Sequence, residues 1–216
     1  MNLKTLLYLI SLLFVLQYPN AQISIDSINL NIEFSNLEEA LKQPEQVFRL
    51  NLSKQTIQLS DTIWTKFSNL QYLSLKDDHL LQLPAGISTL KNLKVLDLSG
   101  NDFKDLPSNF GNLINLQELF LNDEKNFRLE NNITILRELP NLKILHLEND
   151  GLKKLPKNIV QLKNLEYLYL NNNQFKKVPI EIKGLRNLKY LDLHDNRIKV
   201  PIPETQVQSF GIKINF

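Results

Sequence analysis

Leucines recur along the chain at a fixed interval, and apolar and polar positions alternate over short stretches around them. Val47, Leu70 and Leu93 each open a phrase in which the first, fourth and sixth positions are apolar. Alternation with a period of two predicts a short strand with one buried face. Seven such phrases follow one another, starting at residues 47, 70, 93, 116, 142, 165 and 188. Their spacing is 23 residues, except for the 26 residues of the fourth phrase.

A strand this short cannot bury its apolar face alone, so the phrases must stack and share one core. Asparagine at the ninth position, as in Asn101, Asn173 and Asn196, can bond backbone groups where the chain leaves the strand. A Leu-Pro step such as Leu106-Pro107 then turns the chain, because proline fixes the backbone and removes a donor. The return to the next strand has room only for a brief helical or extended segment.

The third phrase, LKVLDLSGNDFKDLPSNFGNLIN, follows the pattern LxxLxLxxNxFxxLPxxFxxLxN. In this pattern the sequence resembles the leucine-rich-repeat family in its 23-residue form, over residues 47 to about 203. The resemblance implies an α/β-type repeat solenoid, a horseshoe with a parallel concave β-sheet and short 3-10, extended or helical convex segments. Animal extracellular members usually close their ends with cysteine pairs. Because this chain has no cysteine, the resemblance favours a secreted bacterial member.

The first residues read as an export signal. Lys4 followed by the apolar run from Leu6 to Leu16 is typical of a signal peptide, and we expect cleavage between Ala21 and Gln22. The alternative is an uncleaved anchor, but the run is shorter than the roughly 20 residues that span a membrane. Residues 1–21 are therefore assigned as a signal peptide, which predicts a secreted, periplasmic or extracellular protein with no membrane span after cleavage.

The open ends of a stacked core need lids. We assign residues 22–46 to an N-terminal cap with an alternating strand up to Phe34 and a helix opened by a capping box at Ser35–Glu38 and ended by Pro44. The seven repeats occupy 47–203. Residues 204–216 form a C-terminal cap, in which the alternation from Ile212 to Phe216 predicts a closing strand.

The fourth phrase carries three extra residues and lacks the asparagine turn and the Leu-Pro step. Residues 125–130 could project as a binding loop beside the sheet, or could be a tolerated insertion, since lengthening a loop costs little free energy. Two sequons, Asn51-Leu-Ser53 and Asn132-Ile-Thr134, match the glycosylation pattern but would be coincidental in a bacterial protein.

Composition and charge narrow the functional classes. The 25 basic and 23 acidic residues are scattered along the sequence, which argues against a basic face and a nucleic-acid partner. His146 and His194 fall on strands two repeats apart, roughly 10 Å from each other at the usual strand spacing, so they do not form a metal site. With no nucleophile motif or phosphate-binding loop, we expect no cofactor and no enzymatic activity.

Strand positions three and five point away from the leucines and should present a binding surface. In the C-terminal repeats these positions predict two rows of exposed aromatic and apolar side chains, with acidic residues at their edge. The aromatic and apolar residues are Phe120, Ile144, His146, Tyr167, Tyr169 and Tyr190, and the acidic ones are Asp97, Asp192 and Glu148. This composition is typical of interface hot spots, whereas the alternative is cross-strand packing without a ligand.

These observations favour a monomeric, non-catalytic module that binds a protein on its concave face. Two alternatives stay open: the aromatic rows could stack on sugar rings, or the solenoid could self-assemble as a structural surface protein.

Overall fold

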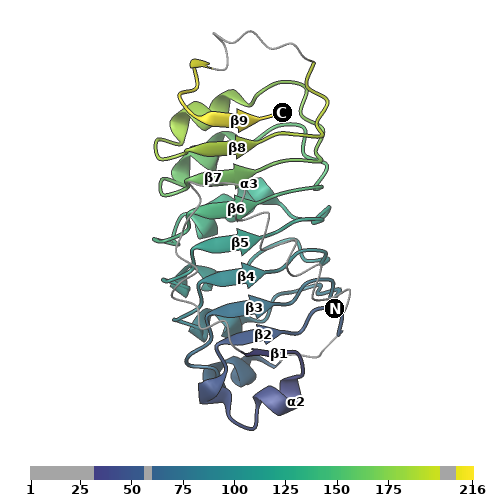
Figure 1. Cartoon of the computed structure of the whole chain (residues 1–216), viewed down its shortest axis with the longest axis vertical. Helices are drawn as coiled ribbons and strands as arrows, with labels where there is room; N and C mark the ends of the chain where they lie inside the picture. The colour runs from purple at the N-terminus through teal and green to yellow at the C-terminus, as the bar shows by residue number, and fades with distance from the viewer. Residues whose placement is uncertain (1–31, 56–59, 200–207) are drawn as a thin grey trace. The chain divides into compact units, whose positions relative to one another are not determined.

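The computed structural model describes residues 32–55, 60–199 and 208–216. The predicted signal peptide lies outside these ranges. Within them, nine short strands form one parallel sheet, ordered as they follow along the chain (Figure 1). The strands are β1 (Glu33–Phe34), β2 (Arg49–Asn51), β3 (Tyr72–Ser74), β4 (Val95–Asp97), β5 (Glu118–Phe120), β6 (Ile144–His146), β7 (Tyr167–Tyr169), β8 (Tyr190–Asp192) and β9 (Lys213–Asn215).

The repeats stack in strict register. The leucine at the fourth position of each repeat pairs with its counterpart in the next, so Leu96 lies opposite Leu73 on one side and Leu119 on the other. Even across the long fourth repeat, Leu119 pairs with Leu145. These leucines are buried in one core cluster that extends from Ala40 to Leu193. The predicted repeat solenoid with a single parallel sheet is confirmed.

Short helical segments pack behind the sheet and complete the core. Most repeats have one 3-10 helix there, at Asp61–Lys66, Ala85–Thr89, Phe110–Asn112, Lys157–Gln161 and Ile180–Gly184. Large aromatic side chains fill the space between these segments and the sheet. Trp64, Phe67, Phe103, Phe110 and Phe175 are fully buried. The short return from each Leu-Pro step therefore folds as the spacing predicts.

The ninth-position asparagines tie consecutive repeats together. The Asn173 amide nitrogen donates to the carbonyls of Leu170 in its own repeat and Leu147 in the preceding one, at 3.0 and 2.7 Å. Its oxygen accepts from the backbone nitrogens of Asp150 and Leu152 at 3.1 and 2.9 Å. Each such asparagine satisfies buried backbone groups of two repeats, as expected for the turn.

A second asparagine column, at the last position of each repeat, lies behind the sheet. Each side chain donates to a backbone carbonyl of the preceding repeat; Asn164, for example, donates to Pro140 at 2.8 Å. The column consists of Asn69, Asn92, Asn115, Asn141, Asn164 and Asn187. The solenoid is thus held by side-chain amides at both ends of its return segments.

The fourth repeat replaces the 3-10 helix with an α-helix, α3 (Leu129–Leu136). The segment before it does not project as a binding loop, because Phe127 packs edge-on against Phe103 with ring centroids 5.8 Å apart. Asn132 is 1% exposed, and its oxygen accepts from the Leu106 nitrogen at 2.8 Å. The extra residues therefore build a buried helix, and the second sequon lies where the folded protein shields it.

The described parts of both predicted caps contain elements of the expected type, whereas residues 22–31 and 204–207 of these caps lie outside the described ranges. The helix α2 (Leu37–Ala40) begins one residue later than predicted, because Asn36 rather than Ser35 caps it by accepting from the Glu39 nitrogen at 3.0 Å. At the other end, the alternating segment forms β9, whose Ile214 pairs with Leu191 of β8.

Candidate functional site

The side chains opposite the leucine core lie in two rows across the sheet, which we call the outward face. Register places Phe120, His146 and Tyr169 side by side in one row, with Asp97 and Asp192 at its two ends. The other row contains Glu118, Ile144, Tyr167 and Tyr190. Each predicted site residue is therefore on this face, because strand alternation and register together fix its place.

The aromatic row is a continuous stack. The His146 ring lies between Phe120, at 3.9 Å and 13°, and Tyr169, at 4.4 Å and 2°. Tyr190 joins from the second row, with its ring 5.7 Å from Tyr169 and 6.5 Å from Tyr167. These contacts fix the side-chain conformations and form a rigid aromatic surface.

The prediction that all these side chains are exposed was wrong. Ile144, His146, Tyr167 and Tyr190 are each less than 9% exposed, and only Phe120 and Tyr169 remain half-buried. Part of the reason is that side chains on neighbouring strands are close enough to cover one another. The accessible part of the row is therefore narrower than the sequence suggested.

His146 lies between two carboxylates. Its Nε2 is 2.9 Å from Glu118 Oε1, and its Nδ1 is 3.5 Å from Glu148 Oε2. Burial by itself lowers the pKa of His146, but the contacts with Glu118 and then Glu148 outweigh it and raise the pKa above its ordinary value. Burial tends to raise the pKa of Glu148, yet the imidazole and two neighbouring amides bring it below its usual range. The stack thus holds an imidazole between two carboxylates, and this arrangement favours the protonated form of His146.

Asp192 does not act as an open rim carboxylate. It is 4% exposed, and Tyr190 Oη donates to its Oδ2 at 3.0 Å. His194 Nδ1 lies 2.6 Å from Oδ1, and Asn215 donates to both oxygens at 3.1 and 3.2 Å. A ligand would have to displace these partners. Asp97, by contrast, is half-buried beside Phe120 and remains a candidate contact.

The N-terminal repeats hold a second cluster that the sequence reasoning missed. The Arg49 guanidinium lies 3.9 Å from the centre of the Tyr72 ring and 2.9 Å from Glu33 Oε2. Arg49 is only 7% exposed. A basic residue and a tyrosine at the same position of consecutive repeats was the available signal, since aligned strands bring them into contact.

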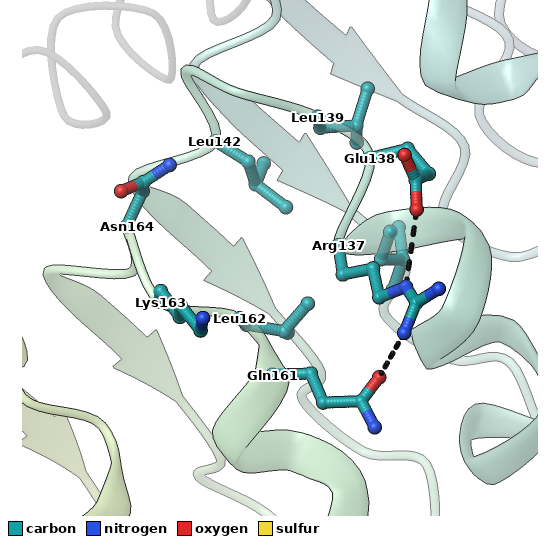
Figure 2. Close-up of a pocket in the computed structure, with 9 residues that line it drawn as sticks. Arg137, Glu138, Leu139, Leu142, Gln161, Leu162, Lys163 and Asn164 are labelled. Carbon is teal, nitrogen blue, oxygen red and sulfur yellow. Dashed lines mark hydrogen bonds and ion pairs between the residues drawn. The ribbon is translucent and has the colours of Figure 1, made fainter.

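A pocket behind the sheet is separate from this face. Figure 2 shows it between the end of α3 and the segment after the Lys157–Gln161 helix. Its volume is about 480 Å³. Arg137 crosses it, with Nε 3.1 Å from Glu138 Oε1 and Nη1 3.3 Å from Gln161 Oε1. Leu139, Leu142 and Leu162 line it and belong to the shared core. Arg137 and Glu138 are paired with each other, and the apolar lining belongs to the shared core, so we do not assign this pocket as the functional site.

Within residues 32–55, 60–199 and 208–216, no group of three or more histidine and acidic side chains could hold a metal ion. In the same part of the chain, no helix is long and apolar enough to cross a bilayer.

Comparisons with known proteins agree with this architecture. A family model described as a leucine-rich repeat region matches residues 46–142, and a leucine-rich-repeat model matches 140–198. No curated protein matches the sequence.

Three solved structures illustrate the likeness. The Toll–Spatzle complex of Drosophila is 18% identical with a TM-score of 0.65, over 76% of this chain and 22% of that one. TLR13 in the TLR13–ssRNA13 complex is 26% identical with a TM-score of 0.65, and the match covers 85% of this chain and 29% of TLR13. Human 5T4, a trophoblast glycoprotein, is 26% identical with a TM-score of 0.61, and the match covers 77% of this chain and 66% of 5T4. This chain thus spans less than two thirds of the length of each.

Proposed function

Because this chain belongs to the leucine-rich-repeat family, we propose that it is a non-catalytic module that binds a protein partner on the outward face of its sheet. The contact centres on Phe120 and Tyr169, with Asp97 beside them. Ile144, His146, Tyr167 and Tyr190 support these two rings from within the rows. Asp192 is left out of the contact because its carboxylate is already engaged.

The stacked row of Phe120, His146 and Tyr169 is the observation that carries this proposal. A partner that docks on a rigid aromatic surface loses little additional side-chain entropy, because the rings are already fixed. Tyrosine, present here as Tyr169, is enriched among interface hot spots. The row lies on rigid strands rather than on loops, which favours a defined binding geometry.

The geometry favours a protein over a sugar or a nucleic acid on this face. Both faces of the His146 ring are already covered, so a sugar cannot stack on it. Although the neighbour TLR13 was determined with single-stranded RNA, Glu118, Glu148 and Asp97 place carboxylates around this row. Like charges disfavour a phosphate backbone there.

Paired alanine substitutions test the proposal. Phe120→Ala with Tyr169→Ala should weaken binding of a captured partner by at least about thirtyfold, the effect of losing one or more hot-spot side chains. Asn51→Ala with Val95→Ala is the matched control, since both residues are half-buried on the same face in earlier repeats. Affinity would be measured by titration calorimetry. Equal losses in the two pairs would refute the assignment.

Export is part of the proposal and rests on Lys4 and the apolar run that follows it. A secreted or periplasmic location would bring the outward face into contact with partners outside the cytoplasm. We also propose that the exported protein is a monomer.

A further inference from the structure

Basic residues gather on the loops that follow β6, β7 and β8. These loops leave the carboxyl ends of the three strands (Figure 1). The loops, residues 149–154, 172–177 and 195–199, hold six basic and two acidic residues. The basic residues, which we call the basic strip, are Lys153, Lys154, Lys176, Lys177, Arg197 and Lys199. The expectation that the protein has no basic face therefore fails here, because the repeat brings lysines that are distant in the sequence to one edge.

The strip is exposed and not neutralised. All six side chains are exposed, and none forms an ion pair with another residue in the part of the chain that the structure describes. Of the two acids, Asp150 is mostly buried, and burial raises its pKa to about 8. Only Asp195 adds an exposed negative charge. The loops thus carry a strong net positive charge at neutral pH.

Hydrogen bonds between the loops fix the spacing of the strip. The Gln174 nitrogen donates to the Leu152 carbonyl at 2.8 Å, and the Arg197 nitrogen donates to the Phe175 carbonyl at 2.9 Å. Phe175 is buried in the core, which anchors the middle loop. Lys153, Lys176 and Lys199 therefore repeat at about the distance between adjacent hydrogen-bonded strands, ~4.8 Å.

We propose that the basic strip binds a linear acidic polysaccharide, a chain that carries a carboxylate on each sugar. The strip runs along the stack with basic residues on three consecutive loops, so a linear polyanion laid along it places several carboxylates within reach of the flexible lysine side chains. A row of cations along one edge suits a linear polyanion better than a planar membrane. Single-stranded nucleic acids are usually bound by aromatic side chains that stack on the bases. The one aromatic residue in the three loops is Phe175, and it is buried.

A second copy of the chain is a weaker candidate. The equivalent loops of repeats two to four are more acidic, but their carboxylates are largely engaged. Asp105 pairs with Arg128, Asp102 lies 3.4 Å from His79, and Glu124 is buried. They offer few free charges to the strip of another copy.

Binding of oligogalacturonate, an acidic oligosaccharide, tests the proposal on the full chain. Lys153→Glu, Lys176→Glu and Lys199→Glu together should lower the affinity about tenfold or more, and added salt should weaken wild-type binding steeply, as for other polyanions. The control combines Lys66→Glu, Lys76→Glu and Lys125→Glu, three exposed lysines outside the strip. It makes the same charge change and should alter the affinity less than about twofold.

Four results would overturn the proposal. They are no binding of oligogalacturonate, equal loss in the two triple variants, equal binding of the methyl-esterified and therefore uncharged oligosaccharide, or tighter binding to single-stranded DNA or anionic vesicles. Circular dichroism establishes that both variants fold. The basic strip does not include Phe120 or Tyr169. A failure of the polysaccharide proposal therefore leaves the proposed protein interaction intact, and a failure of the protein interaction leaves the polysaccharide proposal intact.

Discussion

Replacing Asn173 with alanine is expected to lower the free energy of unfolding by about 3–5 kcal/mol. The side chain is 5% exposed and makes four hydrogen bonds of 3.1 Å or less with backbone groups of two repeats. Alanine leaves those buried groups without partners, and each unsatisfied group costs about 1–3 kcal/mol. Urea unfolding followed by circular dichroism measures the change.

Two variants separate the roles of this side chain. Asn164→Ala removes one exposed bond to Pro140 and should cost only about 1 kcal/mol. Asn173→Asp keeps the acceptor but turns a buried carboxylate oxygen toward the carbonyl oxygens of Leu147 and Leu170, so at neutral pH it should cost at least as much as Asn173→Ala. An Asn173→Ala variant no less stable than Asn164→Ala would show that the asparagine turn does not hold the repeats together.

Glu124→Gln is expected to stabilise the protein at pH 8 by about 4 kcal/mol and to have little effect near pH 4.5. Glu124 takes the asparagine position in the fourth repeat, where its Oε1 accepts from the Asn101 nitrogen at 2.8 Å. It is 2% exposed, and Oε2 has no hydrogen-bond partner in the described ranges. Burial raises the pKa of Glu124 from 4.5 to about 8.

The sign follows from proton binding. Between pH 4.5 and about 8 the folded protein holds a proton on Glu124 that the unfolded chain releases, so wild-type stability falls as the pH rises through this window. Glutamine keeps the acceptor and does not titrate. Urea titrations at pH 5, 6.5 and 8 should show a growing advantage for Glu124→Gln, whereas exposed Glu130→Gln should show none. A constant difference across these pH values would contradict a raised pKa.

Much of the fold could be predicted because the repeat encodes it redundantly. Leu96, Leu119 and Leu145 each predict a strand, and one shared register satisfies all of them. The ninth-position asparagines were predicted for the same reason. The eighth position was missed, although Lys54, Asp77, Gly100, Asp123, Asn149, Asn172 and Asp195 all have a positive φ. Asparagine, aspartate and glycine dominate there because they tolerate this backbone conformation.

The site was less predictable, since alternation fixes which way a side chain points but not how much of it stays accessible. Phe120, His146 and Tyr169 lie in the predicted row, yet their mutual stacking could not be derived from residue type alone. Asp192 looked like a rim carboxylate because its partner Asn215 comes from the closing strand, 23 residues later. The basic strip was not predicted, because the net charge counts all residues together and does not show which of them the repeat brings to one edge.

Photo-crosslinking from the outward face tests the central claim most directly. A photoreactive amino acid at Asp97, beside Phe120 and half-buried, should capture a defined protein from native extracellular material, and the capture should disappear in Phe120→Ala with Tyr169→Ala. The same group at Ile114, which is 48% exposed, serves as the comparison site away from the outward face. It should capture nothing that depends on those two rings. Capture of the same partner from Ile114 alone, or undiminished capture in the double variant, would contradict binding at this face.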